Sequence, residues 1–411
     1  MPVSALPVST YGTIPAHEEA EHISHVEPTL HESLVAVATT NLYFNIALAI
    51  CVPLGIIAGA ARWSDSAIFI INMIGIIALA KMLDLATDQL SGRLGQALSA
   101  LLNASFGNAV ELIVGIIALK DGELVVVQSS LVGSILSNLL LVLGLCFFLG
   151  GLKFKTQSFN SKAAGTGASI FILSLFGFML PAIFALQETD GMHRDLQLSR
   201  GTAVLLVVTY VAFLIFQLIT HKNFYASTVS LTADESEEEE EQPLMTMNVA
   251  IGVLVGSTVL VGICAEYLVS SLEGISESWG LSKVFIGMII LPVIGNAAEH
   301  VSAIYAALRG KMDLAIGVAL GSSLQISIFV TPLLVIIGWI INQPLTLNFP
   351  IIDVAVLFIS ILVVNHTLAD GESNCKIYNN ARARGIYAAD RLSSYCYCIL
   401  SLIKLVKLIV S

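Results

Sequence analysis

Two glutamates inside long apolar stretches are the residues of this chain best suited to chemistry. Glu111 closes the sequence Gly-Asn-Ala-Val-Glu at 107–111, and Glu299 closes Gly-Asn-Ala-Ala-Glu at 295–299. A carboxylate at membrane depth costs at least roughly 2.5 kcal/mol on insertion scales, so it faces a bundle interior or a water-filled cavity. Two such carboxylates suit a hard divalent cation, because calcium binds oxygen ligands at about 2.3–2.6 Å. A hydrogen bond that merely holds two helices together is the alternative.

The residues beside each glutamate can complete a shell of oxygen ligands. Gly107 and Gly295 weaken the helix and can free backbone carbonyl groups for an ion. Asn108 and Asn296 either offer side-chain oxygens to the ion or cap the helix that restarts after a break. The sequence leaves these two roles of the asparagines open.

Further polar residues follow each glutamate at similar distances along the chain. Hydroxyl groups in membrane helices either contact an ion or allow close helix packing, and both roles stay open here. The candidates for ion contact are Ser134, Ser137, Ser322 and Gln325. His300 directly follows Glu299 and either makes a hydrogen bond inside the packed bundle or tunes proton binding by that glutamate. Asp88, four residues after Asp84, and Glu266 either line the access pathway for cations or lie at the membrane interface.

The same two carboxylates can also bind protons. Burial and a nearby like charge both favour the protonated form of a carboxyl group, whereas a bound divalent cation favours the ionised form. Calcium and protons therefore compete for Glu111 and Glu299. If the site faces a neutral compartment and then an acidic one, calcium binds on the first side and protons displace it on the second. This is antiport by mutually exclusive occupancy.

The composition sets the class of protein that carries these residues. Of 411 residues, 56% are apolar and 12% are charged, and the mean hydropathy is +0.86. These values exclude a soluble globule, a secreted disulfide module and a disordered chain, and they predict a polytopic membrane protein. The net charge of −11 argues against nucleic acid as a partner. The sequence contains no Walker, GxSxG or HExxH motif, so it indicates no enzyme, no cofactor and no ATP-driven pump.

Eleven stretches of the chain are long and apolar enough to cross a lipid bilayer, which requires about 20 residues. They predict an all-α polytopic membrane protein with about 11 transmembrane helices. The predicted spans are 41–61, 67–88, 95–119, 123–150, 164–186, 199–220, 247–271, 282–308, 312–341, 346–368 and 386–411. Lys and Arg are more frequent in the loops on the N-terminal side, so the N-terminus is predicted to be cytosolic. The polar residues 1–40 are expected to form a disordered cytosolic tail.

The chain contains an internal repeat. Residues 107–150 align with 295–338 without a gap, and the two Gly-Asn-Ala-x-Glu motifs fall in register. Five predicted spans separate the copies, which is an odd number, so the copies cross the membrane in opposite directions. Inverted repeats are a known transporter architecture, with the binding site between the copies near the midplane. We expect an extra N-terminal transmembrane helix at 41–61, a first five-helix repeat at 67–220 and a second repeat at 247–374.

An acidic loop, residues 222–246, separates the two repeats. Seven of the eight side chains from 234 to 241 are carboxylates. Such a run is usually only solvated, yet beside a membrane it attracts cations. The candidate regulatory cluster consists of Asp234, Glu235, Glu237, Glu238, Glu239, Glu240 and Glu241. The predicted orientation places this loop in the cytosol.

These motifs resemble the cation/calcium exchanger superfamily, and within it the calcium/proton exchangers of fungal and plant vacuoles. The stretches 103–114 and 295–300 are similar to the two repeat signatures of that family. The resemblance extends through most of the chain as far as Asn374. Family members continue with an apolar and aromatic last helix, whereas residues 375–411 form a divergent C-terminal segment that carries several charges.

The resemblance implies an antiporter of the vacuolar membrane that exchanges cytosolic Ca²⁺ for luminal H⁺. It implies a fold of one extra N-terminal helix and two inverted five-helix halves, in which Glu111 and Glu299 bind calcium with backbone carbonyls and waters. It also implies that the acidic stretch forms a short cytosolic helix that collects calcium. Mn²⁺ is a second substrate in some relatives. A sodium/calcium exchanger of the same fold is the alternative, and a passive cation channel or a calcium receptor is a further one.

Overall fold

The structure is a computed structural model that describes residues 28–40, 42–94, 96–154, 156–187, 192–217, 243–369 and 372–374. The elements of its first half are α1 (Leu30–Thr39), α2 (Leu42–Ala60), α3 (Asp65–Ser91), α4 (Gln96–Phe106), α5 (Ala109–Lys120), α6 (Leu124–Leu136), the π-helical η1 (Ser137–Val142), α7 (Leu143–Lys153), β1 (Thr156–Ser158), α8 (Ser161–Gln187) and α9 (Met192–Ile215). Those of its second half are α11 (Met247–Ser270), α12 (Leu272–Trp279), α13 (Lys283–Phe285), η3 (Ile286–Ile290), α14 (Leu291–Gly295), α15 (Ala297–Leu308), α16 (Met312–Gln325), η4 (Ile326–Val330), α17 (Thr331–Ile340), α18 (Ile351–Ala369) and β2 (Glu372–Asn374). The strands pair antiparallel, with Thr156 opposite Asn374.

Eight continuous helices among the described residues are long and apolar enough to cross a membrane. They correspond to eight of the predicted spans and are α2, α3, α6–η1–α7, α8, α9, α11, α16–η4–α17 and α18. A ninth candidate is the pair formed by α12 and α13–η3–α14, which is bent by 116°. The all-α polytopic class is therefore confirmed, with eight or nine candidate spans. The predicted last span, 386–411, lies outside the described residues.

Two of the predicted spans, 95–119 and 282–308, are not single helices. The first breaks at Gly107 and Asn108 between α4 and α5, and the second breaks at Asn296 between α14 and α15. Asn108 has φ −105° and ψ 26°, and Asn296 has φ −92° and ψ 10°, outside the α-helical region. Glycine and asparagine both have low helix propensity, so each break falls where interrupting the helix costs the least free energy. A window that averages hydropathy does not detect such a break.

Helix α1 corrects the expectation of a disordered tail over 1–40. Thr29 begins this helix with a reciprocal cap, in which its hydroxyl accepts from the Glu32 backbone N–H at 3.2 Å and its own N–H donates to the Glu32 carboxylate at 2.8 Å. Two backbone donors are thereby satisfied at the helix start. Residues 1–27, the acidic cluster at 234–241 and the segment 375–411 lie outside the described residues.

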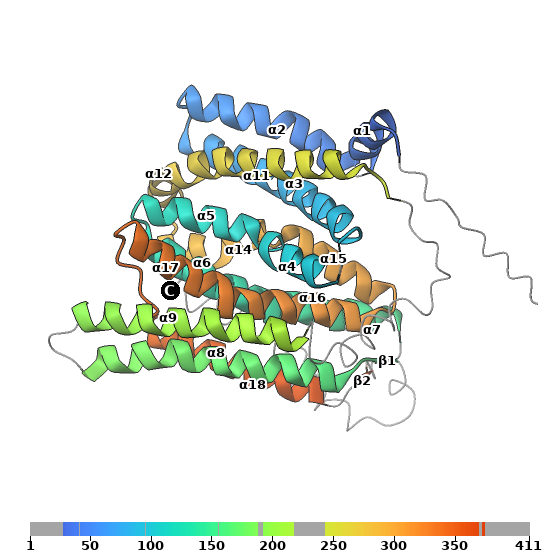
Figure 1. The fold of residues 1–411 in the computed structure, drawn as a ribbon. Coiled ribbons are helices and arrows are strands. Elements are labelled where there is room, and N and C mark those ends of the chain that lie inside the picture. Colours follow the sequence, from blue (N-terminus) through green and yellow to red (C-terminus); the bar gives the residue numbers. More distant parts are fainter. Residues whose placement is uncertain are drawn as a thin grey trace, which may run out of the picture.

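The helices lie side by side in one bundle (Figure 1). α2, α3 and α11 form the upper layer in this view, and α3 packs against the other two. Helices from both halves of the chain, including α5, α6, α14, α16 and α17, form the middle, and α8, α9 and α18 lie below them. The two copies of the repeat are therefore interleaved and do not form separate domains.

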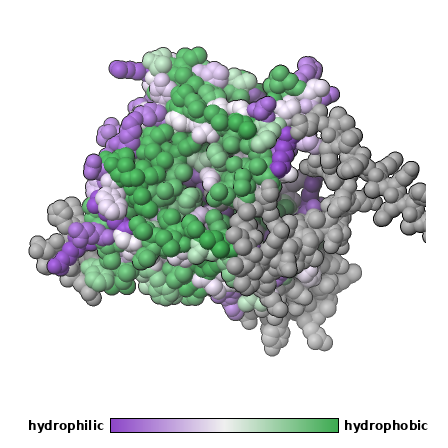
Figure 2. Space-filling view, in the orientation of Figure 1, coloured by the Kyte–Doolittle hydropathy of each residue, from purple (hydrophilic) through white to green (hydrophobic). Residues whose placement is uncertain are grey.

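The outside of the bundle is apolar over most of its length. Large exposed side chains include Ile57 on α2, Phe176 on α8, Leu205 on α9, Val259 on α11 and Ile359 on α18. Figure 2 shows a broad hydrophobic surface over the described helices, with hydrophilic residues gathered toward their ends. A soluble monomer rarely exposes an apolar patch of this extent, whereas lipid covers it in a membrane protein.

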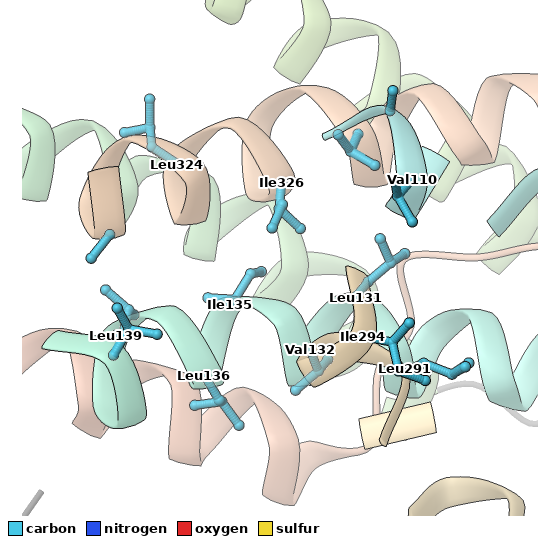
Figure 3. Close-up of a cluster of buried hydrophobic side chains, with 14 of the residues drawn as sticks. Val110, Leu131, Val132, Ile135, Leu136, Leu139, Leu291, Ile294, Leu324 and Ile326 are labelled. Carbon is cyan, nitrogen blue, oxygen red and sulfur yellow. The ribbon is translucent and has the colours of Figure 1, made fainter. Parts of the chain in front are cut away.

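Apolar side chains from both copies fill the centre of the bundle. Figure 3 shows a cluster that α5, α6 and η1 build together with α14, α16 and η4. Its labelled members are Val110, Leu131, Val132, Ile135, Leu136, Leu139, Leu291, Ile294, Leu324 and Ile326, none more than 7% exposed. This packing fixes the separation of the segments that carry the two glutamates.

The closest approach within this centre joins α6 to η3. A β-carbon at Gly133 would lie 2.1 Å from the carbonyl oxygen of Met288, and one at Gly287 would lie 2.9 Å from the Ser129 β-carbon. Because real β-carbons do not approach backbone so closely, only glycine permits this contact. The two glycines thus let the backbones of the two copies meet.

We expect Gly133→Ala to destabilise the fold by about 1–3 kcal/mol, the usual range for overpacking a close contact. The thermal unfolding midpoint of the purified protein in detergent measures this effect. Gly256→Ala in α11 is the matched control, because nothing lies within 4 Å of the β-carbon that it adds. Equal midpoints for the two variants would contradict the close packing of α6 on η3.

Candidate ion-binding site

Each of the two glutamates lies in the first turn of a helix that restarts after a break. Glu111 is in the first turn of α5, and Glu299 is in the first turn of α15. The free backbone N–H groups and the dipole at a helix N-terminus favour negative charge. The Gly-Asn-Ala-x-Glu motif therefore sets both the break and a favourable backbone field around the carboxylate.

Each carboxylate lies against the helix break of the other copy. A β-carbon added at Gly295 would lie 2.5 Å from Glu111 Oε1, and one added at Gly107 would lie 3.8 Å from Glu299 Oε1. At position 295 any larger side chain would displace the carboxylate. The structure thus brings the two predicted glutamates and the two predicted glycines together in crossed pairs.

The two asparagines make hydrogen bonds across the repeat and do not cap their own helices. Ser322 Oγ donates to Asn108 Oδ1 at 3.1 Å, and Asn296 Nδ2 donates to Ser134 Oγ at 3.2 Å. Asn108 Nδ2 also donates to Gln325 Oε1 at 2.7 Å. Neither asparagine side chain caps the helix that restarts after it, although Asn296 Nδ2 also donates to the Pro292 carbonyl of the preceding α14 at 3.1 Å. The serines and the glutamine hold the asparagines in place beside the glutamates.

Several oxygen atoms at this site are buried without a hydrogen-bond donor from the described residues. They are Glu111 Oε1, Glu299 Oε2 and Asn296 Oδ1. Buried polar atoms are almost always paired, so three unpaired oxygens at one place require a ligand that supplies positive charge or a proton. Carboxylate and amide oxygens are the ligands that hard cations prefer. The set of donors therefore fits both Ca²⁺ and H⁺.

A cavity of about 380 Å³, the entry cavity, leads to Glu299 from one end of the bundle. Its wall includes Asp84 and Asp88 near the end of α3 and Leu314 near the start of α16, which identifies that end. A much smaller cavity of about 20 Å³ adjoins Glu111 and is lined mostly by apolar side chains. In this conformation Glu299 lines the entry cavity, whereas Glu111 lines the small one.

Three other predicted residues lie at different places. The Ser137 hydroxyl donates to the Ser134 carbonyl at 3.0 Å, within its own helix. Asp88 belongs to the wall of the entry cavity. Glu266 pairs with Lys120 at 3.1 Å and is absent from the lining of both cavities. The structure therefore brings Asp88 to the access route and places Glu266 elsewhere.

Asn138 in η1 is a site residue that sequence reasoning missed. Its side chain is 1% exposed, its Oδ1 lies 3.0 Å from His300 Nε2, and its Nδ2 donates to Ser322 Oγ at 3.1 Å. Asn138 thereby joins His300 to the hydrogen bonds that hold Asn108. The available signal is its position four residues after Ser134, on the same face of one helix.

Comparison with known proteins places this geometry in a family. A sequence profile described as Sodium/calcium exchanger protein matches residues 65–219 and 249–400. A Vacuolar calcium ion transporter of Schizosaccharomyces pombe is 49% identical over 335 residues, which cover 81% of this chain and 80% of the relative. A Ca(2+)/H(+) antiporter of Synechocystis is 41% identical over 349 residues, which cover 82% and 93%. The crystal structure of a Ca²⁺/H⁺ antiporter, YfkE, is similar with a TM-score of 0.70 at 34% identity, over 88% of this chain and 99% of that one.

Both Gly-Asn-Ala-x-Glu motifs fall within the residues that the profile matches. The relatives match at high identity over about four fifths of this chain. Sequence and fold therefore agree on one lineage. The chain belongs to the cation/calcium exchanger superfamily and, within it, to the CAX-type cation/proton exchangers.

Proposed function

We propose that this chain is a secondary active antiporter that moves cytosolic Ca²⁺ into the vacuole in exchange for luminal H⁺. The observation that carries the proposal is the pair Glu111 and Glu299, each set against the helix break of the other copy, with buried oxygens that lack donors. The names of two relatives support it, since one is a vacuolar calcium ion transporter and another is a Ca²⁺/H⁺ antiporter.

The contacts at the site support an architecture of two inverted repeats. Two kinds of contact each occur twice, once in each direction between the copies. A glutamate of one copy lies against a glycine of the other, and an asparagine of one copy is hydrogen-bonded to a serine of the other. The π-helical segments η1 and η4 also occupy matching places in the alignment of 107–150 with 295–338. We count α4–α5 and α13–α15 as one broken span each. The proposed fold has one extra N-terminal helix and two five-helix halves, and the residues after 374, where the last helix is predicted, lie outside the described residues.

Exchange follows from competition at the carboxylates. With calcium bound, Glu111 and Glu299 are ionised and share the ion with the Asn296 side-chain oxygen and with backbone carbonyls at the breaks. Protonation of the carboxylates removes the charge that holds the ion and releases it. Because calcium and protons exclude each other, the site changes compartments carrying one or the other. No further chemical group is required for coupling.

The entry cavity faces the cytosol in the proposed orientation. The turns at that end carry Arg93, Lys153, Arg309 and Lys311, as expected where positive loops stay inside. The N-terminus and the acidic cluster at 234–241 belong to the same side. Calcium from the cytosol thus enters through the cavity whose wall carries carboxylates.

Calcium uptake by purified protein in liposomes with an acidic interior tests the proposal. Uptake driven by the pH gradient and abolished by a protonophore supports calcium/proton exchange. Uptake that requires an outward sodium gradient would identify a sodium/calcium exchanger of the same fold. Flux that persists after both gradients collapse would identify a passive channel.

We expect Glu111→Gln and Glu299→Gln each to reduce the initial rate of proton-driven calcium uptake at least about 100-fold. An amide keeps the shape of the side chain but offers the ion one oxygen fewer and no charge. Even mutation of residues that contact a metal only through its ligands lowers metal affinity or activity about 10–100-fold. The control is Glu277→Gln, because this glutamate is exposed on α12. Uptake at the wild-type rate by either variant would overturn the assigned role of that glutamate.

Gly295→Ala is expected to reduce the rate of uptake at least about tenfold without unfolding the protein. The added β-carbon would lie 2.5 Å from Glu111 Oε1, so the carboxylate must move. A displacement of about 1 Å at a functional group can lower the rate up to about 100-fold. Gly201→Ala in α9 adds a β-carbon with nothing within 4 Å and serves as the control. If the two variants transport equally well, Glu111 does not hold the ion from this position.

A further inference from the structure

A partly exposed ion pair lies on α3 beside the entry cavity. Lys81 Nζ is 2.5 Å from Asp84 Oδ2, and the two side chains are 24% and 36% exposed. Lys81 lies ten residues before the end of α3 at Ser91, which is about 15 Å along the helix axis. Charged side chains within a membrane-spanning helix are costly, pair with one another and mark ion pathways.

Only one member of this pair belongs to the cavity wall. Asp84 lines the entry cavity together with Glu299, and Lys81 holds Asp84 from one turn earlier on the same helix. The small cavity on the other side of the site has no such pair, because Glu111 is the one charged residue in its lining. The pair is therefore not part of the duplicated ion-binding core. It belongs to a single access route.

The Lys81 ammonium group offsets the charge of Asp84, one of the carboxylates of a wall that also contains Asp88 and Glu299. An unpaired Asp84 carboxylate would add a negative charge beside Glu299 and would retain a divalent cation on its way in. A lysine amine in contact with the carboxylate cancels this charge at short range. Lysine is suited to this role because its ammonium is a compact point charge on a flexible stem.

We propose that Lys81 is a positioning residue that sets the calcium affinity of the entry route. By occupying Asp84 it removes one carboxylate of the cavity wall from binding Ca²⁺ and so weakens retention of the ion on its way to Glu299. The inference rests on the calcium exchange proposed above and deepens it. It predicts an effect on the KM for calcium, because neither Lys81 nor Asp84 forms part of the exchange site between the two glutamates.

Opposite charge changes at the two positions test the proposal in the full-length protein. Lys81→Met leaves Asp84 unpaired and is expected to lower the KM for calcium uptake at least about threefold, while Asp84→Asn leaves Lys81 unpaired and is expected to raise it at least about threefold. The double variant Lys81→Met/Asp84→Asn restores the net charge, so its KM should lie within about twofold of the wild-type value. Lys81→Arg, which keeps the charge, should leave KM unchanged.

Lys283→Met provides the matched control. Lys283 pairs with Glu123 at 2.7 Å at similar exposure, 33% and 23%, but neither residue lines the entry cavity. Its removal should leave KM unchanged. If Lys81→Met and Asp84→Asn shift KM in the same direction, or change only kcat, the pair has a structural role and the proposal is overturned. If Lys81→Met does not fold, Asp84→Asn decides alone, since an unchanged or lower KM would overturn it.

Equilibrium binding of radioactive calcium in detergent separates this inference from the proposed function. The expected order of affinity is Lys81→Met above wild type above Asp84→Asn. That order would stand even if the wild-type protein showed no proton-driven uptake, in which case the antiport proposal would fail alone. Uptake driven by protons together with equal affinities for the three proteins would overturn the role of Lys81 and leave antiport intact.

Discussion

Two carboxylates in the middle of an apolar bundle constrain everything around them. No Lys or Arg is among the residues that line their two cavities, so within those linings neutralisation comes from a cation or a proton that arrives from outside. The helix breaks help to stabilise the carboxylates, because each glutamate lies in the first turn of a restarting helix, where the helix dipole favours negative charge. The glycine at the break in the opposite copy then leaves space for each carboxylate, and at position 295 a β-carbon would lie only 2.5 Å from Glu111 Oε1.

The duplicated and the unduplicated residues do different work. Glutamate, glycine, asparagine and serine recur in both copies and meet in crossed pairs, and the proposed function assigns ion binding to them. The charged residues around this core do not recur in their contacts. Lys81 and Asp84 lie beside the entry cavity, whereas Glu266 pairs with Lys120 in an exposed contact of the kind that adds little stability. In the proposed mechanism the duplicated residues form one ion site that serves both compartments. The residues around it differ between the two sides, and so do the two cavities, at about 380 and 20 Å³.

Sequence reasoning predicted the class of fold, which the structure confirms, and the residues that the structure brings together as the candidate site, because both leave local signals. Hydropathy alone locates eight continuous spans, and the depth of Glu111 and Glu299 within apolar windows marks them as functional. The breaks inside 95–119 and 282–308 escaped the span count, since two weak helix formers do not change an average over 20 residues. Asn138 and Lys81 escaped for a related reason, as one polar residue within a span barely lowers its hydropathy.

Other features depend on contacts that no local pattern contains. Whether Asn108 caps its own helix or reaches across the repeat is decided by where Ser322 lies, more than 200 positions away. The pairing of Glu266 with Lys120 is likewise a product of how α11 packs on α5. Propensity and periodicity describe neighbours in sequence, and these partners become neighbours only in the folded bundle.

The crossed pairs also join residues that are synthesised far apart in time. The Ser322–Asn108 and Asn296–Ser134 bonds join residues 214 and 162 positions apart, and strand β1 finds its partner only in β2 at 372–374. A ribosome that has released the first half of the chain has therefore placed Glu111 in the bilayer before the glycine and asparagine that surround it exist. The early helices must wait in the membrane with this carboxylate incompletely enclosed. A chain that ends between residues 299 and 322 therefore carries both carboxylates but lacks the Ser322 hydroxyl that donates to Asn108.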